Sequence, residues 1–134
     1  MMNEPSSARL MKLVEGLLAQ TREGLREWSE TDQDFVFDCD TPRAAVRIES
    51  LDRDDGPPFR IVVLNSSGKE VESLNSTARG LDTFDIGAFA ELYQLAKRSA
   101  LGADELIDDL FEELGISAAA EDAEAKGVEG KESA

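Results

Sequence analysis

The sequence contains no histidine and only one cysteine, Cys39, among its 134 residues. Without histidine, Ser-His-Asp and Cys-His catalysis and histidine-ligated metal sites are excluded. One cysteine can form neither an internal disulfide nor a cysteine-rich zinc site. Cys39 lies on the predicted inner face of a strand, where we expect a buried and unreactive thiol. The side chains by which small enzymes most often show their activity are therefore missing.

Long apolar runs are missing as well. No stretch approaches the roughly 18 apolar residues of a membrane-spanning helix, and no signal-like apolar segment follows a basic start. Because a disulfide framework is also lacking, we expect a cytoplasmic protein. Hydrophobic residues make up 41% of the chain and aromatic residues 6%, which predicts a mainly aliphatic core in a single domain over residues 1–116.

Positive charge is scarce, with 14 lysines and arginines against 29 aspartates and glutamates and a net charge of -15. Such a surface repels phosphate backbones and anionic lipids, so we expect no direct contact with nucleic acid and none with membranes. Residues 84–116 carry the largest negative excess, with eight acidic residues and two basic ones. Solubility alone can explain this charge, and a basic protein partner is the functional alternative.

Apolar residues at three- and four-residue spacing predict three helices. The first covers residues 7–28 and is closed by Trp28, with Gly16 and Gly24 tolerated inside it. The second begins at a cap among residues 82–85 and ends near Lys97 and Arg98. The third covers residues 103–114 and ends at a cap made by Gly115. Its apolar residues are expected to point inward: Leu106, Ile107, Leu110, Phe111 and Leu114.

Between these helices the hydrophobic period changes from 3.6 to two, which predicts four strands over residues 35–40, 44–49, 59–64 and 71–74. Short turns favour an antiparallel meander. The predicted fold is therefore a two-layer α+β domain, with an N-terminal helix, a four-stranded antiparallel meander and two C-terminal helices. The inner face of the sheet should hold Phe35, Phe37, Cys39, Val46, Ile48, Phe59, Ile61, Val63 and Val71.

Residues 117–134 contain mainly Ala, Glu, Lys, Gly and Ser with a single Val128. They cannot bury enough apolar surface to offset the entropy of ordering them. We expect an acidic tail that is disordered or frays.

Carboxylates are the remaining candidates for chemistry. The acidic segment from Asp52 to Gly56 resembles the start of a calcium loop, but its twelfth position is Val63, which cannot ligate a cation. An acidic turn is the better interpretation. Carboxylates on the third helix would need to converge with acids from a second element to hold Mg²⁺ or transfer protons. We therefore assign no catalytic, cofactor-binding or metal-binding residue and expect no cofactor.

Two surfaces are candidates for contact with a partner. On the outer face of the sheet, apolar residues stand among charged ones, which indicates an interface unless helices cover both faces. On the third helix, rows of acidic side chains form a face that suits a basic partner. The candidate contact residues are Arg47, Arg60, Val62 and Leu64 on the sheet, and Asp104, Asp108, Asp109 and Glu112 on the helix.

Three segments together resemble a family of small uncharacterised bacterial α+β proteins built from a helix, an antiparallel sheet and two helices. They are Thr21-x-x-Gly24-x-x-x-Trp28-x-x-Thr31, the Asn65-Ser66-Ser67-Gly68 turn, and Leu92-Tyr93-x-Leu95-Ala96-Lys97-Arg98 followed by Asp104-Glu105-x-x-Asp108-Asp109-Leu110. The similarity spans about residues 10–115. It implies a bacterial source and carries no activity or site residues.

These observations favour a non-catalytic protein-binding or accessory protein that acts through a surface. The partner would be another protein, for example a basic one, or a second copy of the chain. One alternative is an acidic inhibitor or immunity protein directed against a basic toxin or a nucleic-acid enzyme. The opposing alternative is an enzyme that uses carboxylates alone or with Mg²⁺, which requires acids converging in a pocket.

Overall fold

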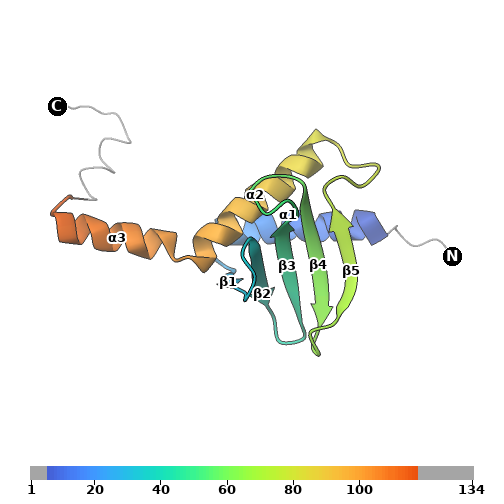
Figure 1. Ribbon diagram of the computed structural model, residues 1–134, viewed down its shortest axis with the longest axis horizontal. Coiled ribbons are helices and arrows are strands. Elements are labelled where there is room, and N and C mark those ends of the chain that lie inside the picture. The colour runs from blue at the N-terminus through green and yellow to red at the C-terminus, as the bar shows by residue number, and fades with distance from the viewer. Residues whose placement is uncertain (1–5, 118–134) are drawn as a thin grey trace. The chain divides into compact units, whose positions relative to one another are not determined.

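The computed structural model describes residues 6–117 and confirms an α+β fold with an N-terminal helix, an antiparallel sheet and two C-terminal helices (Figure 1). The sheet has five strands and not the four that were predicted. The elements are α1 (Ser6–Arg22), β1 (Ser29–Glu30), β2 (Val36–Asp40), β3 (Ala44–Ser50), β4 (Phe59–Asn65), β5 (Glu70–Asn75), α2 (Thr83–Ala100) and α3 (Ala103–Leu114).

The five strands form a meander in the order β1-β2-β3-β4-β5, and every neighbouring pair is antiparallel. Cross-strand pairing aligns Phe37 with Ile48, Ile48 with Ile61, and Ile61 with Leu74, which places one row of apolar side chains across four strands. The additional strand β1 has only two residues, both polar, so no alternation of apolar residues could reveal it.

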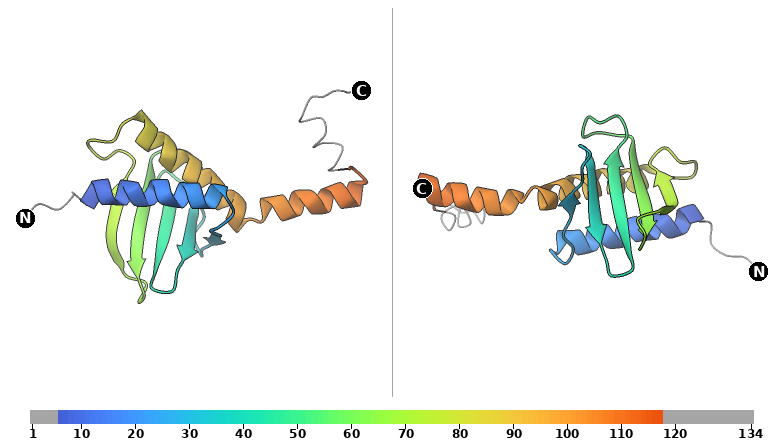
Figure 2. Two further views of the ribbon diagram at one scale, coloured as in Figure 1. Left: turned by 180° about the vertical axis from the view of Figure 1, so that it is seen from behind. Right: turned by 60° about the horizontal axis from the view of Figure 1, so that its bottom comes forward.

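Helices α1 and α2 both lie on one face of this sheet, and the core fills the space between the two layers (Figure 2). Tyr93 of α2 is the largest fully buried side chain, and its ring packs against the rings of Phe37 and Phe59, with centroids 5.6 and 5.1 Å away. Burying each large apolar side chain stabilises the fold by about 1.5–3 kcal/mol. The core is confirmed at most predicted inner-face positions: Phe37, Cys39, Val46, Ile48, Phe59 and Ile61 are buried, and Val63 is partly buried.

The first helix is shorter than predicted, because it ends at Arg22. Gly24 adopts a φ of +77°, and its N–H donates to the carbonyl of Thr21 while the N–H of Leu25 donates to the carbonyl of Gln20. This pair of bonds is the Schellman motif that commonly closes helices at a left-handed glycine. Leu25 consequently lies outside the helix and is exposed. The prediction that Gly24 is tolerated within a longer helix is wrong.

Trp28 is buried, as expected of a core anchor, although it follows the helix instead of closing it. Its indole N–H donates to the hydroxyl of Thr21 over 3.1 Å, and its backbone N–H donates to the hydroxyl of Ser99 over 2.9 Å. These bonds connect the segment before β1 to both α1 and α2.

Two residues predicted on the inner face of the sheet lie elsewhere. Phe35 precedes β2 in a left-handed conformation with a φ of +68°, which takes its side chain out of the strand alternation. Val71 is half exposed, because a register shift between Val63 and Leu64 changes the alternation where β4 pairs with β5. Leu74 is the residue of β5 that reaches the core.

The second helix begins as predicted. Asp82 caps it, with its side chain accepting a hydrogen bond from the backbone of Asp85, and the side chain of Asp85 accepts one from the backbone of Asp82 in return. The helix runs two residues beyond Arg98 and ends at Ala100, before Gly102, whose φ is +64°. Ile86, which was expected in the apolar stripe of this helix, is exposed.

The described residues divide into two compact units, one ending at Leu101 and the other starting at Gly102. The expected single domain over residues 1–116 stays a prediction. In the second unit, α3 ends with the predicted glycine cap: Gly115 has a φ of +72°, and the N–H of Ile116 donates to the carbonyl of Phe111. Apart from Ser117, the predicted tail over residues 117–134 lies outside the described residues.

Within residues 6–117 the helices are too short or too polar to cross a membrane.

Candidate functional site

The four candidate residues of the sheet lie together on the face opposite the helices. Arg47 pairs with Val62 across β3 and β4, and Arg60 pairs with Glu49 in the same ladder. Because Ile48 and Ile61 point into the core and side chains alternate along a strand, their neighbours point to the other face. Leu64 lies two residues beyond Val62 and shares that face. Figure 2 shows that neither α1 nor α2 covers this face.

Both arginines on this face are engaged by acids of the same sheet. Arg47 makes a two-pronged ion pair with Asp38, with nitrogen–oxygen distances of 2.8 and 3.1 Å, and this bond raises the pKa of the Arg47 guanidinium. Arg60 bridges Glu49 and Glu70 at 3.4 and 2.8 Å. Their positive charges are therefore balanced locally and offer little net charge to an acidic partner.

The apolar candidates on this face are hidden. Val62 is 2% exposed and Leu64 is 6% exposed, although neither belongs to the core cluster between the layers. Long charged side chains such as those of Arg47 and Arg60 cover apolar neighbours with their aliphatic stems. The surface of this sheet face is therefore mainly charged, and not the expected mixture of apolar and charged residues. The role of these four residues in contacting a partner stays a prediction.

The third helix has the opposite character. Leu106, Leu110 and Leu114 are exposed, and no residue of α3 is buried. The expectation that its apolar residues point inward is therefore not met. The candidate acids Asp104, Asp108, Asp109 and Glu112 lie on the same helix, together with Glu105 and Glu113. Among residues 6–117, no group of three or more acidic or cysteine side chains is placed to hold a metal ion.

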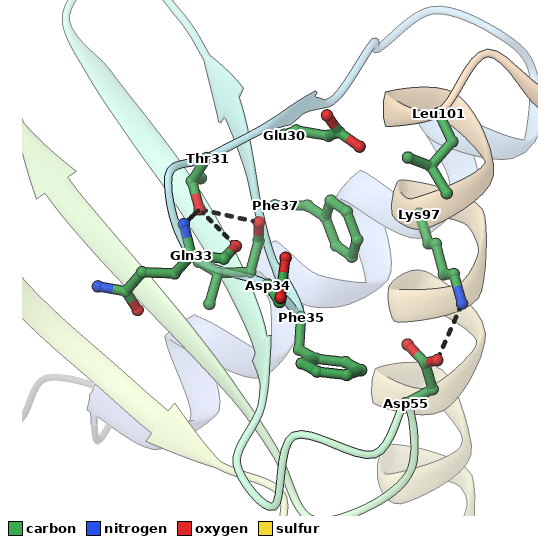
Figure 3. A pocket seen from close by; sticks show the side chains of 10 residues that line it. Glu30, Thr31, Gln33, Asp34, Phe35, Phe37, Asp55, Lys97 and Leu101 are labelled. Carbon is green, nitrogen blue, oxygen red and sulfur yellow. Dashed lines mark hydrogen bonds and ion pairs between the residues drawn. The ribbon is translucent and has the colours of Figure 1, made fainter.

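A groove of about 250 Å³ lies between the β1–β2 segment and α2 (Figure 3). The rings of Phe35 and Phe37 form its wall, with Glu30 and Leu101 toward one end and the ion pair between Lys97 and Asp55 at the other.

The charged groups of Lys97 and Asp55 bond to each other, so they are not directed toward a ligand in the groove. The groove consequently presents little organised chemistry to a ligand.

Asp55 is the most heavily bonded carboxylate of the groove, and it was not among the predicted site residues. It accepts a 2.6 Å hydrogen bond from the Tyr93 hydroxyl and a 2.9 Å bond from the Lys97 ammonium, while its carbonyl accepts one from Gln94. The bonds from Tyr93 and then Lys97 lower the pKa of Asp55. Burial, followed by the bond to Asp55, raises the pKa of Tyr93, which keeps its phenol protonated.

The rest of the acidic segment from Asp52 to Gly56 also has a structural role. The Asp54 carboxylate accepts a hydrogen bond from the backbone N–H of Gly56, and the Ser50 hydroxyl donates to the Gly56 carbonyl. The segment is an acidic turn, as predicted, and Asp55 fastens it to α2. The spacing of Tyr93 and Lys97, one helical turn apart, is the only sequence signal for a shared partner.

Cys39 is 1% exposed, and burial raises the pKa of its thiol. Both observations fit a small core hydrophobe and not a nucleophile, which requires a lowered thiol pKa.

Comparison of the chain with protein-family models, curated proteins and solved structures found no match. The resemblance to a family of small bacterial proteins therefore stays a prediction.

Proposed function

We propose that this chain is a non-catalytic protein that works by binding another protein, and that α3 makes the contact. The observation that carries this proposal is the apolar side of α3. Five large apolar side chains recur at helical spacing in 12 residues, and none of them is buried: Leu106, Ile107, Leu110, Phe111 and Leu114. We call this set the α3 stripe.

The energetics of a short helix support a binding role for the α3 stripe. A 12-residue helix is marginal in water on its own, because isolated helices need about 12–15 residues or more even with favourable composition. Removing one large apolar side chain from water contributes about 1.5–3 kcal/mol. Burial of the stripe in a complementary groove therefore stabilises both the helix and a complex, as in other helix-in-groove interactions.

The groove and the carboxylates give less support to an enzyme. A carboxyl group that serves as a general acid or base near neutral pH needs a raised pKa. Within the described part of the chain, the two carboxyl groups with a shifted pKa are Asp55 and Glu91, and hydrogen bonds lower the pKa of both. Tyr93 and Lys97 hold Asp55, and Arg22 holds Glu91. These carboxylates are better suited to fastening elements together than to proton transfer.

The composition of α3 favours a narrower version of the same function. The helix has six acidic residues and no basic one, which is the charge pattern expected of an inhibitor or immunity protein that covers a basic surface.

The proposal can be tested with two matched substitutions. Tagged full-length protein is incubated with extract of the cells that naturally produce it, and retained proteins are quantified for wild type, Leu110→Asp and Phe84→Asp. Phe84 is 88% exposed on α2 and serves as an apolar control outside the α3 stripe. We expect wild type and Phe84→Asp to retain the same protein in near-equal molar amount and Leu110→Asp to lose it. Equal retention by Leu110→Asp, or no specific retention by wild type, would contradict the proposal.

A further inference from the structure

The acidic residues of α3 lie on the side of the helix that the α3 stripe leaves open. With about 100° of rotation per residue, Leu110 and Leu114 lie near the middle of the α3 stripe and Leu106 and Phe111 lie at its two edges. The remaining arc carries the six acids.

Four of these six acids form two pairs on different sides of the helix, whereas Asp104 lies beside the Phe111 edge of the stripe and Asp108 lies between Asp104 and Glu112. Asp109 and Glu113 run beside the Leu106 edge of the stripe, so we call them the rim acids. Glu105 and Glu112 lie on the side opposite the stripe, so we call them the back acids. The first pair would face a partner that covers the stripe, whereas the second pair would face water.

This arrangement discriminates between the surfaces that could cover the α3 stripe. A second copy of the helix would bring two sets of acids together along the same seam, and like charges across a helix pair are unfavourable. An anionic membrane favours amphipathic helices whose polar side carries lysine and arginine, and α3 has neither. A protein groove with basic rims would bury the apolar side chains of the stripe and place positive charges beside the acids that border it.

We propose that the α3 stripe docks into an apolar groove of a partner protein that carries lysine or arginine along its rims, with Asp109 and Glu113 making the rim contacts and Glu105 and Glu112 remaining in solvent. This inference depends on the proposed function, and it specifies the chemistry of the partner. The apolar groove provides most of the affinity, and the rim charges provide orientation and faster association.

The expected size of the charge effect follows from exposed ion pairs. Each such pair contributes about 0.2–1 kcal/mol, so losing two of them weakens binding roughly twofold to thirtyfold. The back acids would make no ion pair with the partner, so removing their charge should not weaken binding by this amount. Screening by salt acts on the rim contacts and leaves the apolar contact in place.

The experiment uses synthetic helical peptides as probes of defined chemistry. Three peptides share one leucine stripe and differ in the flanking positions, which are all lysine, all glutamine or all glutamate. Titration calorimetry measures their binding to the full-length chain at low and at moderate salt. We expect the lysine peptide to bind at least about tenfold more tightly than the glutamine peptide, with an affinity that falls as salt rises, and the glutamate peptide to bind weakest.

Two pairs of isosteric substitutions locate the contacts. Asp109→Asn with Glu113→Gln should weaken the lysine peptide within the range given above and reduce its salt dependence. Glu105→Gln with Glu112→Gln, which removes the same charge from the back of the helix, should change its affinity by less than about twofold. Equal losses in the two double variants would overturn the assignment of rim and back acids.

Other outcomes separate this inference from the proposed function. If the glutamine peptide binds as tightly as the lysine peptide and both are lost in Leu110→Asp, the basic rim is wrong while protein binding through the stripe stands. If the lysine peptide does not bind, or binds Leu110→Asp equally well, the inference is overturned. If sedimentation shows a dimer that Leu110→Asp abolishes, a second copy covers the stripe and the basic partner is rejected.

Discussion

The hydroxyl of Tyr93 donates a 2.6 Å hydrogen bond to the carboxylate of Asp55, a residue 38 positions earlier in the chain. Tyr93 is fully buried between the sheet and the helices, so this bond lies at the edge of the core. It joins the β3–β4 turn to α2, and Lys97 reinforces the same contact. Asp55 also lines the groove, so the bond from Tyr93 holds a groove residue in place and gives a direct way to test the fold.

Removing the carboxylate of Asp55 should destabilise the protein. Asp55→Ala leaves the Tyr93 hydroxyl without its acceptor, and a buried donor left unsatisfied costs about 1–3 kcal/mol. Asp52→Ala, an exposed acid in the same turn, should change the free energy of unfolding by less than about 0.5 kcal/mol. Urea titration monitored by circular dichroism measures both, and equal values for the two variants would show that the Tyr93 contact contributes nothing.

The same pair predicts the pH dependence of stability. The pKa of Asp55 is lower in the folded state than its ordinary value of 3.8, so its contribution is fully present above that pH and is lost as pH falls through the folded value. The pKa of Tyr93 is raised above 10.0, so its contribution is present below that pH and is lost as pH rises beyond it.

In Tyr93→Phe, the free energy of unfolding should therefore no longer fall at alkaline pH through this residue, and its decrease at acid pH should become smaller. Urea midpoints measured between about pH 3 and pH 11 test this. A variant profile parallel to that of wild type at both ends would contradict the assignment.

Two glycines in and after α1 should respond to alanine with opposite signs. Gly16 lies inside the helix on an exposed position, and an added Cβ meets nothing within 4 Å, so Gly16→Ala should stabilise the protein by about 0.5–1 kcal/mol. Gly24 has a φ of +77°, a left-handed conformation that is unfavourable for alanine, so Gly24→Ala should destabilise the protein by about 1–2 kcal/mol. Thermal melting of the two variants gives the comparison, and shifts of the same sign would show that α1 does not end in the left-handed glycine.

Aspartate introduced at an apolar position should distinguish α2 from α3. Leu92 is fully buried, and Leu92→Asp places an unpaired charge in the core, which should cost more than about 3 kcal/mol and prevent stable folding. Leu110 is 42% exposed, and Leu110→Asp should change the free energy of unfolding of the sheet by less than about 0.5 kcal/mol. A large loss in Leu110→Asp would mean that the stripe is part of the core and not a binding surface.

The fold could be predicted where periodicity is strong. Alternation over residues 44–48 and 59–63 identified β3 and β4, because Val46 and Ile48 in β3, and Phe59 and Ile61 in β4, are core residues at every second position. β1 could not be predicted, since Ser29 and Glu30 are polar and pair only because β2 lies beside them. A left-handed backbone at Phe35 likewise depends on tertiary contacts, and an aromatic residue carries no sequence signal for it.

The candidate site was predicted less completely, for a different reason. Periodicity shows that α3 is amphipathic, but it cannot show whether Leu110 packs on the same chain or on another molecule. The contact between Asp55 and Tyr93 joins residues far apart in sequence, so it appears only once β4 and α2 are assembled. The burial of Val62 on the open face depends on side chains from neighbouring strands, which a single-strand pattern does not contain.

Site-specific photo-crosslinking in the native cells tests the central claim most directly. A photoreactive residue is placed in turn at three positions of the α3 stripe, Leu106, Leu110 and Leu114, and at the two back acids, Glu105 and Glu112. The account predicts that the three stripe positions crosslink to one and the same protein and that the two back positions give little product. Equal yields from both sides of the helix, or no protein product from the stripe, would contradict it.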